Sequence, residues 1–228
     1  MTKNFLKRII TSIFLISLLL IINFNNKLIF VLSILVVGVL ICVEANTLFS
    51  KLGRKKFSKK IYIEKFNLKF IFLNLLTFLY VFLIFCYFSY KLHNTLGPYY
   101  FLYVVSICFF TDIGGYIFGK IIGGKKLTKI SPNKTISGTM GSFLLSIVPL
   151  FLFLNLDNID IEFSLKDVLF VLLVSLISQL GDLFISFLKR KAKIKDTGKI
   201  LPGHGGVLDR IDGIIFAVPF SYFLLKLL

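Results

Sequence analysis

The sequence predicts an all-α polytopic integral membrane protein with about seven (roughly 6–9) transmembrane helices and a cytoplasmic N-terminus. Three observations support this prediction: the chain is strongly apolar, its apolar residues form long blocks, and its positive charges gather between alternate blocks. Of the 228 residues, 57% are hydrophobic and 17% are charged, whereas ordinary soluble domains are about half apolar and about a quarter charged. A disordered chain is excluded, because such chains are poor in aromatic residues and this one has 27 Phe. A soluble nucleic-acid-binding protein would explain the net charge of +16 but not the hydrophobicity.

The apolar blocks are long enough, or nearly so, to form the roughly 20 residues of helix that cross a bilayer. The first and last blocks are the shortest. The first follows a basic tail, as in a signal peptide, but no small-residue cleavage site comes after it, so we expect a retained helix. The predicted spans are residues 9–24, 28–49, 70–90, 98–119, 136–154, 168–188 and 211–227.

The positions of Lys and Arg orient these spans, because both residues are enriched in cytoplasmic loops of membrane proteins. With a cytoplasmic N-terminus, all but four of the 27 Lys and Arg residues lie on the cytoplasmic side. The basic loop at residues 51–69 is interpreted as an orientation signal that also contacts anionic headgroups. The four exceptions are Lys27, Lys91, Lys166 and Lys226.

A polar stripe runs along the sixth predicted span. Its members follow one another at three- and four-residue steps, which places them on one face of a helix. Interhelical hydrogen bonds explain Ser175 and Ser178, whereas a buried carboxylate requires a cation or a proton, so Asp182 is a candidate site residue. The stripe consists of Ser175, Ser178, Gln179, Asp182, Ser186 and Lys189.

The fourth span carries one acid, Asp112, next to Gly114 and Gly115. Asp112 is expected to neutralise a basic residue, coordinate an ion or form a hydrogen bond across helices. The cytoplasmic stretch that follows is rich in glycine and lysine and contains Ser131, Lys134 and Thr135. Glycines and lysines suit phosphate binding, although the spacing fits neither a P-loop nor a dinucleotide-binding fingerprint.

The densest group of polar residues lies between Ser186 and Asp212. Asp209 and Asp212 are three residues apart, so on a helix they share a face. Together with Asp182 they are expected to surround divalent cations, since Mg²⁺ prefers oxygen ligands and retains substrate phosphates as co-ligands. Carboxylates mixed with many Lys and Arg residues favour a polyphosphate substrate.

The segment resembles the signature of the phosphatidate cytidylyltransferase family, S-x-x-K-R-x4-K-D-x5-P-x-H-G-G-x-x-D-R-x-D. A second stretch, residues 131–138, resembles the family's S-P-K-K-T-W-E-G, with Asn133, Ile136 and Ser137 as departures. Any role of the family's Glu in that stretch is therefore in doubt for this chain. The fixed positions of the signature are Ser186, Lys189, Arg190, Lys195, Asp196, Pro202, His204, Gly205, Gly206, Asp209, Arg210 and Asp212.

The resemblance implies an integral membrane enzyme, usually a homodimer, that forms CDP-diacylglycerol and pyrophosphate from CTP and phosphatidic acid. It implies Mg²⁺, with K⁺ in a supporting role, and Asp182 and Asp209 as the metal ligands. We expect a multi-pass protein of the cell inner membrane, surrounded by membrane lipids, with its active site on the cytoplasmic side and no nucleic-acid partner. Residues 1–95 then form an N-terminal transmembrane region with the basic loop, and residues 96–228 form the catalytic region with the signature at 181–212.

The remaining site residues divide into two groups under this resemblance. His204 is expected to orient a phosphate or to transfer a proton, and Asp212 to be a further metal ligand or to support one. The expected catalytic residues are Lys189, Arg190, Asp196, His204, Arg210 and Asp212. The expected substrate-binding residues are Asp112, Ser131, Lys134, Thr135, Ser186, Lys195, Gly205 and Gly206.

Two alternatives remain open. A polyprenol kinase or a cytidylyltransferase for another lipid phosphate would use CTP with a related site, and the products separate them, since a kinase releases CDP and cytidylyl transfer releases pyrophosphate. An anion transporter is disfavoured because its polar residues tend to lie near the bilayer midplane between inverted repeats, whereas here they gather at one end of the spans.

Overall fold

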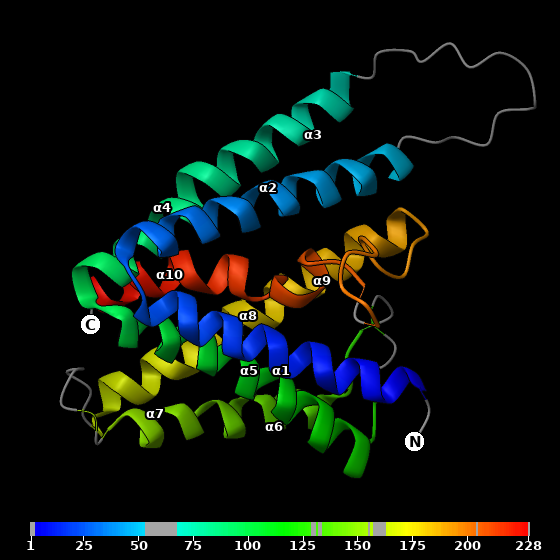
Figure 1. Cartoon of the computed structure of the whole chain (residues 1–228). Helices are drawn as coiled ribbons and strands as arrows, with labels where there is room; N and C mark the ends of the chain where they lie inside the picture. Colours follow the sequence, from blue (N-terminus) through cyan, green and yellow to red (C-terminus); the bar gives the residue numbers. More distant parts are fainter. Residues whose placement is uncertain are drawn as a thin grey trace, which may run out of the picture.

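The computed structural model describes residues 3–52, 68–128, 131, 134–154, 156, 163–203 and 205–227. Regular structure in these residues is helical, and the β-type pairing within them consists of two isolated bridges (Figure 1). The predicted all-α fold is confirmed.

The N-terminal part consists of long helices. Helix α1 covers Lys3–Phe24 and α2 covers Lys27–Leu52. Helices α3 (Leu68–Leu79) and α4 (Tyr87–Lys91) are joined and extended by the π-helical segments η1 (Tyr80–Cys86) and η2 (Leu92–Leu96). Residues Leu68–Leu96 therefore form one continuous helical span, which lies alongside α2 in Figure 1.

The C-terminal part packs shorter helices against two long ones. In chain order its elements are α5 (Pro98–Ile121), α6 (Ile136–Ser146), α7 (Val148–Phe153), α8 (Leu165–Lys191), α9 (Leu208–Ile211) and α10 (Ile214–Leu227).

Five described helical segments are long and apolar enough to cross a membrane, and a shorter apolar helix covers Ile10–Phe24. Large apolar side chains point outward from them; Ile13 and Phe14 on α1 are 63% and 61% exposed. Apolar surface of this extent is typical of contact with lipid. A polytopic membrane protein is thus confirmed, while the number of seven spans, the cytoplasmic N-terminus and the division at residue 95 stay predictions.

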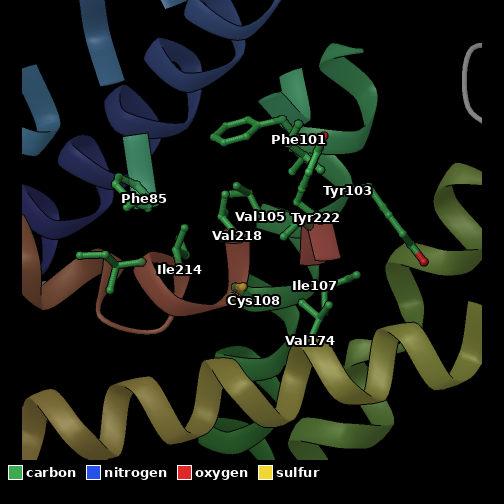
Figure 2. Close-up of a cluster of buried hydrophobic side chains, with 14 of the residues drawn as sticks. Phe85, Phe101, Tyr103, Val105, Ile107, Cys108, Val174, Ile214, Val218 and Tyr222 are labelled. Carbon is green, nitrogen blue, oxygen red and sulfur yellow. The ribbon is translucent and has the colours of Figure 1, made fainter. Parts of the chain in front are cut away.

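The core lies where α5, α8 and α10 meet. Cys108 of α5 lies between these helices, near Val218 of α10 and Val174 of α8 (Figure 2). Beside this cluster the Thr111 hydroxyl of α5 donates to Ser175 Oγ of α8 at 2.9 Å. Ser175 therefore forms the interhelical hydrogen bond expected of it.

Glycines bring α5 and α6 into backbone contact. A Cβ atom at Gly114 would collide with the backbone of Gly141, and one at Gly141 would collide with the Phe118 ring. The absence of side chains at both positions allows this approach. The contact aligns the C-terminal half of α5, which carries Asp112, with the beginning of α6, which follows Lys134.

Candidate active site

The polar stripe lies on helix α8. It continues to the C-terminal end of the helix, where the signature segment begins. The Ser164 hydroxyl caps the helix by accepting the Asp167 N–H at 3.2 Å, and three basic residues in the last turn suit the negative end of the helix dipole. The helix ends at Lys191, and the chain continues through residues 192–203 and 205–207 to α9 (Figure 1). Helix α9 contacts α2. Asp182, Ser186 and Lys189 lie on the C-terminal half of α8, and Lys189 contacts Asp209 of α9.

Asp182 is the centre of the first part of the site. Lys134 forms an ion pair with its Oδ2, and the Ser186 hydroxyl donates to its Oδ1 at 3.2 Å. The carboxyl groups of Asp182 and Asp212 also lie within hydrogen-bonding reach of each other. One lysine and two carboxyl groups, from three separate segments, thus meet at the end of α8.

A folded-back loop positions Lys134. The Leu127 N–H donates to the Lys134 carbonyl at 2.8 Å, and the Ile136 N–H donates to the Lys125 carbonyl at 3.0 Å. Thr135 then caps α6 by accepting the Gly138 N–H at 3.1 Å. Ser137, which departs from the family pattern, donates its hydroxyl to the Gly123 carbonyl. In this chain, position 137 ties the glycine-rich loop to the beginning of α6.

Asp209 is the centre of the second part. Its Oδ1 is 2.8 Å from Lys189 Nζ, and that ammonium is also 4.0 Å from Asp212 Oδ2. Its Oδ2 accepts the Thr197 N–H at 2.8 Å, the Thr197 hydroxyl at 3.0 Å and the Gly206 N–H at 2.9 Å. Lys189 therefore links the two parts of the site through Asp212.

These contacts decide the ionisation of Asp209. Burial acts to raise the pKa of its carboxyl group, but hydrogen bonds from Lys189 and from the Gly206 and Thr197 backbones outweigh burial, so the pKa lies below its ordinary value. Asp209 is therefore ionised at neutral pH.

Glycine is required in the loop at position 205. Gly205 has φ +85°, in the left-handed region that residues with a Cβ atom rarely adopt. A Cβ atom there would also lie 2.9 Å from Asp209 Oδ2. The neighbouring Gly206 supplies one of the N–H donors to the same oxygen.

The structure brings many of the predicted site residues together and leaves the side chains of others exposed. Lys134, Asp182, Ser186, Lys189, Asp209 and Asp212 form one connected network, with Gly205 and Gly206 beside Asp209. Arg190, Lys195, Asp196 and Arg210 are exposed. Thr135 acts as a helix cap, and Ser131 lies in the loop before it, where its carbonyl accepts the Lys134 N–H. His204 lies outside the described residues.

Asp112 is exposed on α5. It is close enough to Asp182, Lys134 and Arg210 for their charges to interact. Its predicted role in substrate binding stays a prediction.

Sequence analysis missed one acid at the site. Glu44 of α2 is 2% exposed, and its carboxylate contacts the loop that holds Asp209. An available signal was overlooked, because an ionisable residue inside a predicted span is a functional candidate and Glu44 is the only acid in residues 28–49.

The donor chemistry of the site fits a hard divalent cation. Within the described residues, no group of three His, Cys, Asp or Glu side chains lies close enough together to hold a metal ion without other ligands. Mg²⁺ is usually bound through one or two carboxylates and completes its shell with water and substrate phosphates, and the facing carboxyl groups of Asp182 and Asp212 suit that pattern. Lys134 and Lys189 already form ion pairs with Asp182 and Asp209. A metal ion can therefore bind Asp209 Oδ1 only when Lys189 moves away.

The fold and the site together define a polytopic α-helical membrane protein with a lysine–carboxylate network at one end of its helices. Comparison with known proteins agrees with this class. A sequence model described as the cytidylyltransferase family matches residues 58–228, three quarters of the chain. The protein belongs to the cytidylyltransferase family.

Curated relatives share the same region. The chain is 43% identical over 132 residues to the phosphatidate cytidylyltransferase of Bacillus subtilis (strain 168), which covers 58% of this chain and 49% of that protein. It is 45% identical to the phosphatidate cytidylyltransferase of Staphylococcus haemolyticus (strain JCSC1435) and 46% identical to that of Staphylococcus aureus (strain COL), each over 57% of this chain and 50% of the relative. The matched stretch thus spans about half the length of these relatives.

Proposed function

We propose that the protein is a CTP:phosphatidate cytidylyltransferase, which forms CDP-diacylglycerol and pyrophosphate from CTP and phosphatidic acid in phospholipid biosynthesis. The observation that carries the proposal is the network in which Lys134 and Lys189 contact Asp182, Asp209 and Asp212 at the end of α8. Clustered cations beside carboxylates suit a reaction between two phosphate-bearing substrates, whose negative charge shifts during the transfer. The relatives named phosphatidate cytidylyltransferase support the choice of these substrates.

The site lies at the ends of α8 and α5 near basic loops, which the distribution of Lys and Arg assigns to the cytoplasm. We therefore propose a protein of the cell inner membrane with its active site on the cytoplasmic side. CTP then arrives from the cytoplasm, and phosphatidic acid reaches the site with its acyl chains still in the bilayer. The homodimer stays a prediction.

The reaction joins a phosphate oxygen of phosphatidic acid to the α-phosphorus of CTP and breaks the bond from that phosphorus to the bridging oxygen. The pyrophosphate formed leaves with the bonding electrons. The attacking phosphate is already ionised, so no side chain is required as a general base. Positioning and charge compensation therefore dominate.

The lysines are well placed for this task. Lys134 and Lys189 are held by carboxylates, and each ammonium group has three donors, so it can also contact a substrate phosphate. Lys189 is 12% exposed in its side chain and is fixed by Asp209. Once Lys189 has left Asp209 Oδ1, its ammonium can pair with a substrate phosphate and offset the charge that develops there.

We propose that Asp182 and Asp209 hold Mg²⁺, with Asp212 as a further ligand or as the hydrogen-bonding partner of Asp182, and with K⁺ in a supporting role. When bound, the metal supplies positive charge to the phosphates of CTP and to the leaving pyrophosphate. The carboxylate oxygens are the chain's own contribution, and Ser186 orients Asp182 through its hydrogen bond.

A direct assay tests the proposal. The purified protein in detergent, given Mg²⁺, CTP and phosphatidic acid, is expected to produce CDP-diacylglycerol and pyrophosphate in equal amounts. Diacylglycerol in place of phosphatidic acid lacks the attacking phosphate and is expected to give no product, and a chelator is expected to stop the reaction. Release of CDP without CDP-diacylglycerol would instead indicate a CTP-dependent lipid kinase and would refute the proposal.

A further inference from the structure

We infer that Glu44 is a positioning residue, which holds the loop between α8 and α9 in the conformation that places Asp209 and Asp212 in the site. Its catalytic consequence depends on the proposed function. The inference concerns a residue that the family match leaves out, because that match begins at residue 58.

Glu44 is buried, and both oxygens of its carboxylate accept hydrogen bonds. Its Oε1 accepts the Val207 N–H at 2.9 Å, and its Oε2 accepts the Leu208 N–H at 2.9 Å and the Thr197 hydroxyl at 2.8 Å. These donors come from both ends of the loop, since Thr197 follows α8 and Leu208 begins α9. One carboxylate on α2 therefore ties the two ends of the loop together.

The loop is shaped to receive this carboxylate. A Cβ atom at Gly198 would lie 2.9 Å from Glu44 Cδ, and one at Gly206 would lie 2.7 Å from the same atom. Side chains at these two positions would displace the carboxylate. The glycines thus permit a contact with Glu44 in addition to any contact with phosphate.

Thr197 transmits the position of Glu44 to Asp209. Its hydroxyl oxygen is 2.8 Å from Glu44 Oε2 and 3.0 Å from Asp209 Oδ2. A hydroxyl has a single hydrogen, so it can donate to one carboxylate at a time while it stays between both. Asp209 in turn holds Lys189. Displacing Glu44 would therefore shift Asp209 and Lys189 through Thr197, although Glu44 belongs to a different helix, α2.

The test is Glu44→Gln, which keeps the volume of the side chain and replaces one oxygen by a group that donates. Whichever way the amide lies, at least one of the three loop donors loses its acceptor. We expect residues 196–212 of the purified protein to exchange their amide hydrogens about tenfold faster than in the wild type. Peptides from α5 and α10 should exchange at the wild-type rate, because a positioning role is local.

Turnover provides the second readout. Displacing catalytic groups by about 1 Å lowers rates by roughly 100-fold, so Glu44→Gln should lower kcat for CDP-diacylglycerol by about that factor. The control is Glu162→Gln, the same chemical change in the predicted loop on the other side of the membrane, which should leave both exchange and kcat unchanged.

Wild-type exchange in residues 196–212 of Glu44→Gln would overturn the inference, as would faster exchange spread over all helices, which marks a general loss of folding. If Glu44→Gln cannot be purified, Thr197→Val tests the same connection, and faster exchange confined to residues 196–212 supports it whereas wild-type exchange refutes it. If the wild type forms no CDP-diacylglycerol, the proposed function fails, and the exchange of the variant still decides whether Glu44 holds the loop.

Discussion

Replacing Asp209 by Asn is expected to lower CDP-diacylglycerol formation by roughly 100- to 1,000-fold, a typical effect of removing one preorganised electrostatic group from an active site. One oxygen of the carboxylate binds Lys189, and the other accepts the Thr197 and Gly206 N–H groups and lies 3.0 Å from the Thr197 hydroxyl oxygen. An amide has only one oxygen, so its NH₂ group must face either the ammonium or the loop donors. The change therefore removes a proposed metal ligand and misplaces Lys189 and the loop together.

The measurement is CDP-diacylglycerol formation by membranes that contain equal amounts of variant and wild type. The matched control is Asp167→Asn, at the other end of α8 from Asp182, where the carboxylate accepts a hydrogen bond from the Ser164 hydroxyl. That variant should retain wild-type turnover. Wild-type turnover in Asp209→Asn, with the protein folded in the membrane, would contradict the proposed role of Asp209.

Lys189→Met is expected to abolish activity and also to destabilise the protein. It leaves the carboxylate of Asp209, whose side chain is 5% exposed, without its cation. Removing one partner of a buried ion pair costs about 3–5 kcal/mol of unfolding free energy. Lys189→Arg retains the charge and should recover part of the stability, whereas a planar guanidinium does not reproduce the position of the ammonium, so activity should stay low.

Thermal unfolding in detergent and the product assay measure the two effects separately. The control is Lys191→Met, two residues further along α8, where the side chain is exposed and its ammonium lies 4.6 Å from the centre of the Phe187 ring. This exposed contact contributes about 0.5–1 kcal/mol, so stability should change little and activity should persist. If Lys189→Met were as stable and active as Lys191→Met, the network would not have the role proposed for it.

Periodicity predicted the part of the site that lies on one helix. Asp182, Ser186 and Lys189 follow each other at helical steps, and the structure places Ser186 on Asp182 as one face of α8. The sequence also led us to expect Asp182, Asp209 and Asp212 near one another. In the structure α10 packs against α8, and Lys189 of α8 contacts both Asp209 and Asp212. These are local patterns, which a helix converts directly into geometry.

Contacts between distant segments were harder to predict. Nothing in the sequence pairs Lys134 with Asp182, or Glu44 with the N–H groups of Val207 and Leu208. Such pairs depend on which helices are neighbours in the fold. Every residue except proline has a backbone N–H, so the sequence does not show which of them binds a distant carboxylate. Glu44 was also missed because its span reads as a uniform apolar block, although a single acid in such a block is costly and therefore informative.

The exact start of the last helix could not be predicted from the apolar pattern. One apolar span was expected at residues 211–227, and α10 covers Ile214–Leu227 of it, but a break at Asp212 and Gly213 separates α10 from α9. A Cβ atom at Gly213 would lie 2.8 Å from the Ser178 carbonyl of α8, and one at Gly181 would lie 2.9 Å from the Asp212 carbonyl. The break lets the two backbones approach, and this packing against α8 brings Asp212 to Asp182.

Transfer of the cytidylyl group is the central claim, and the position of a radioactive label in CTP tests it most directly. CTP labelled at the α-phosphorus, given to the protein with phosphatidic acid and Mg²⁺, should transfer its label to the lipid product. CTP labelled at the γ-phosphorus should release its label as pyrophosphate and leave the lipid unlabelled. Transfer of the γ label to lipid, with the α label remaining in CDP, would identify a kinase and contradict the account.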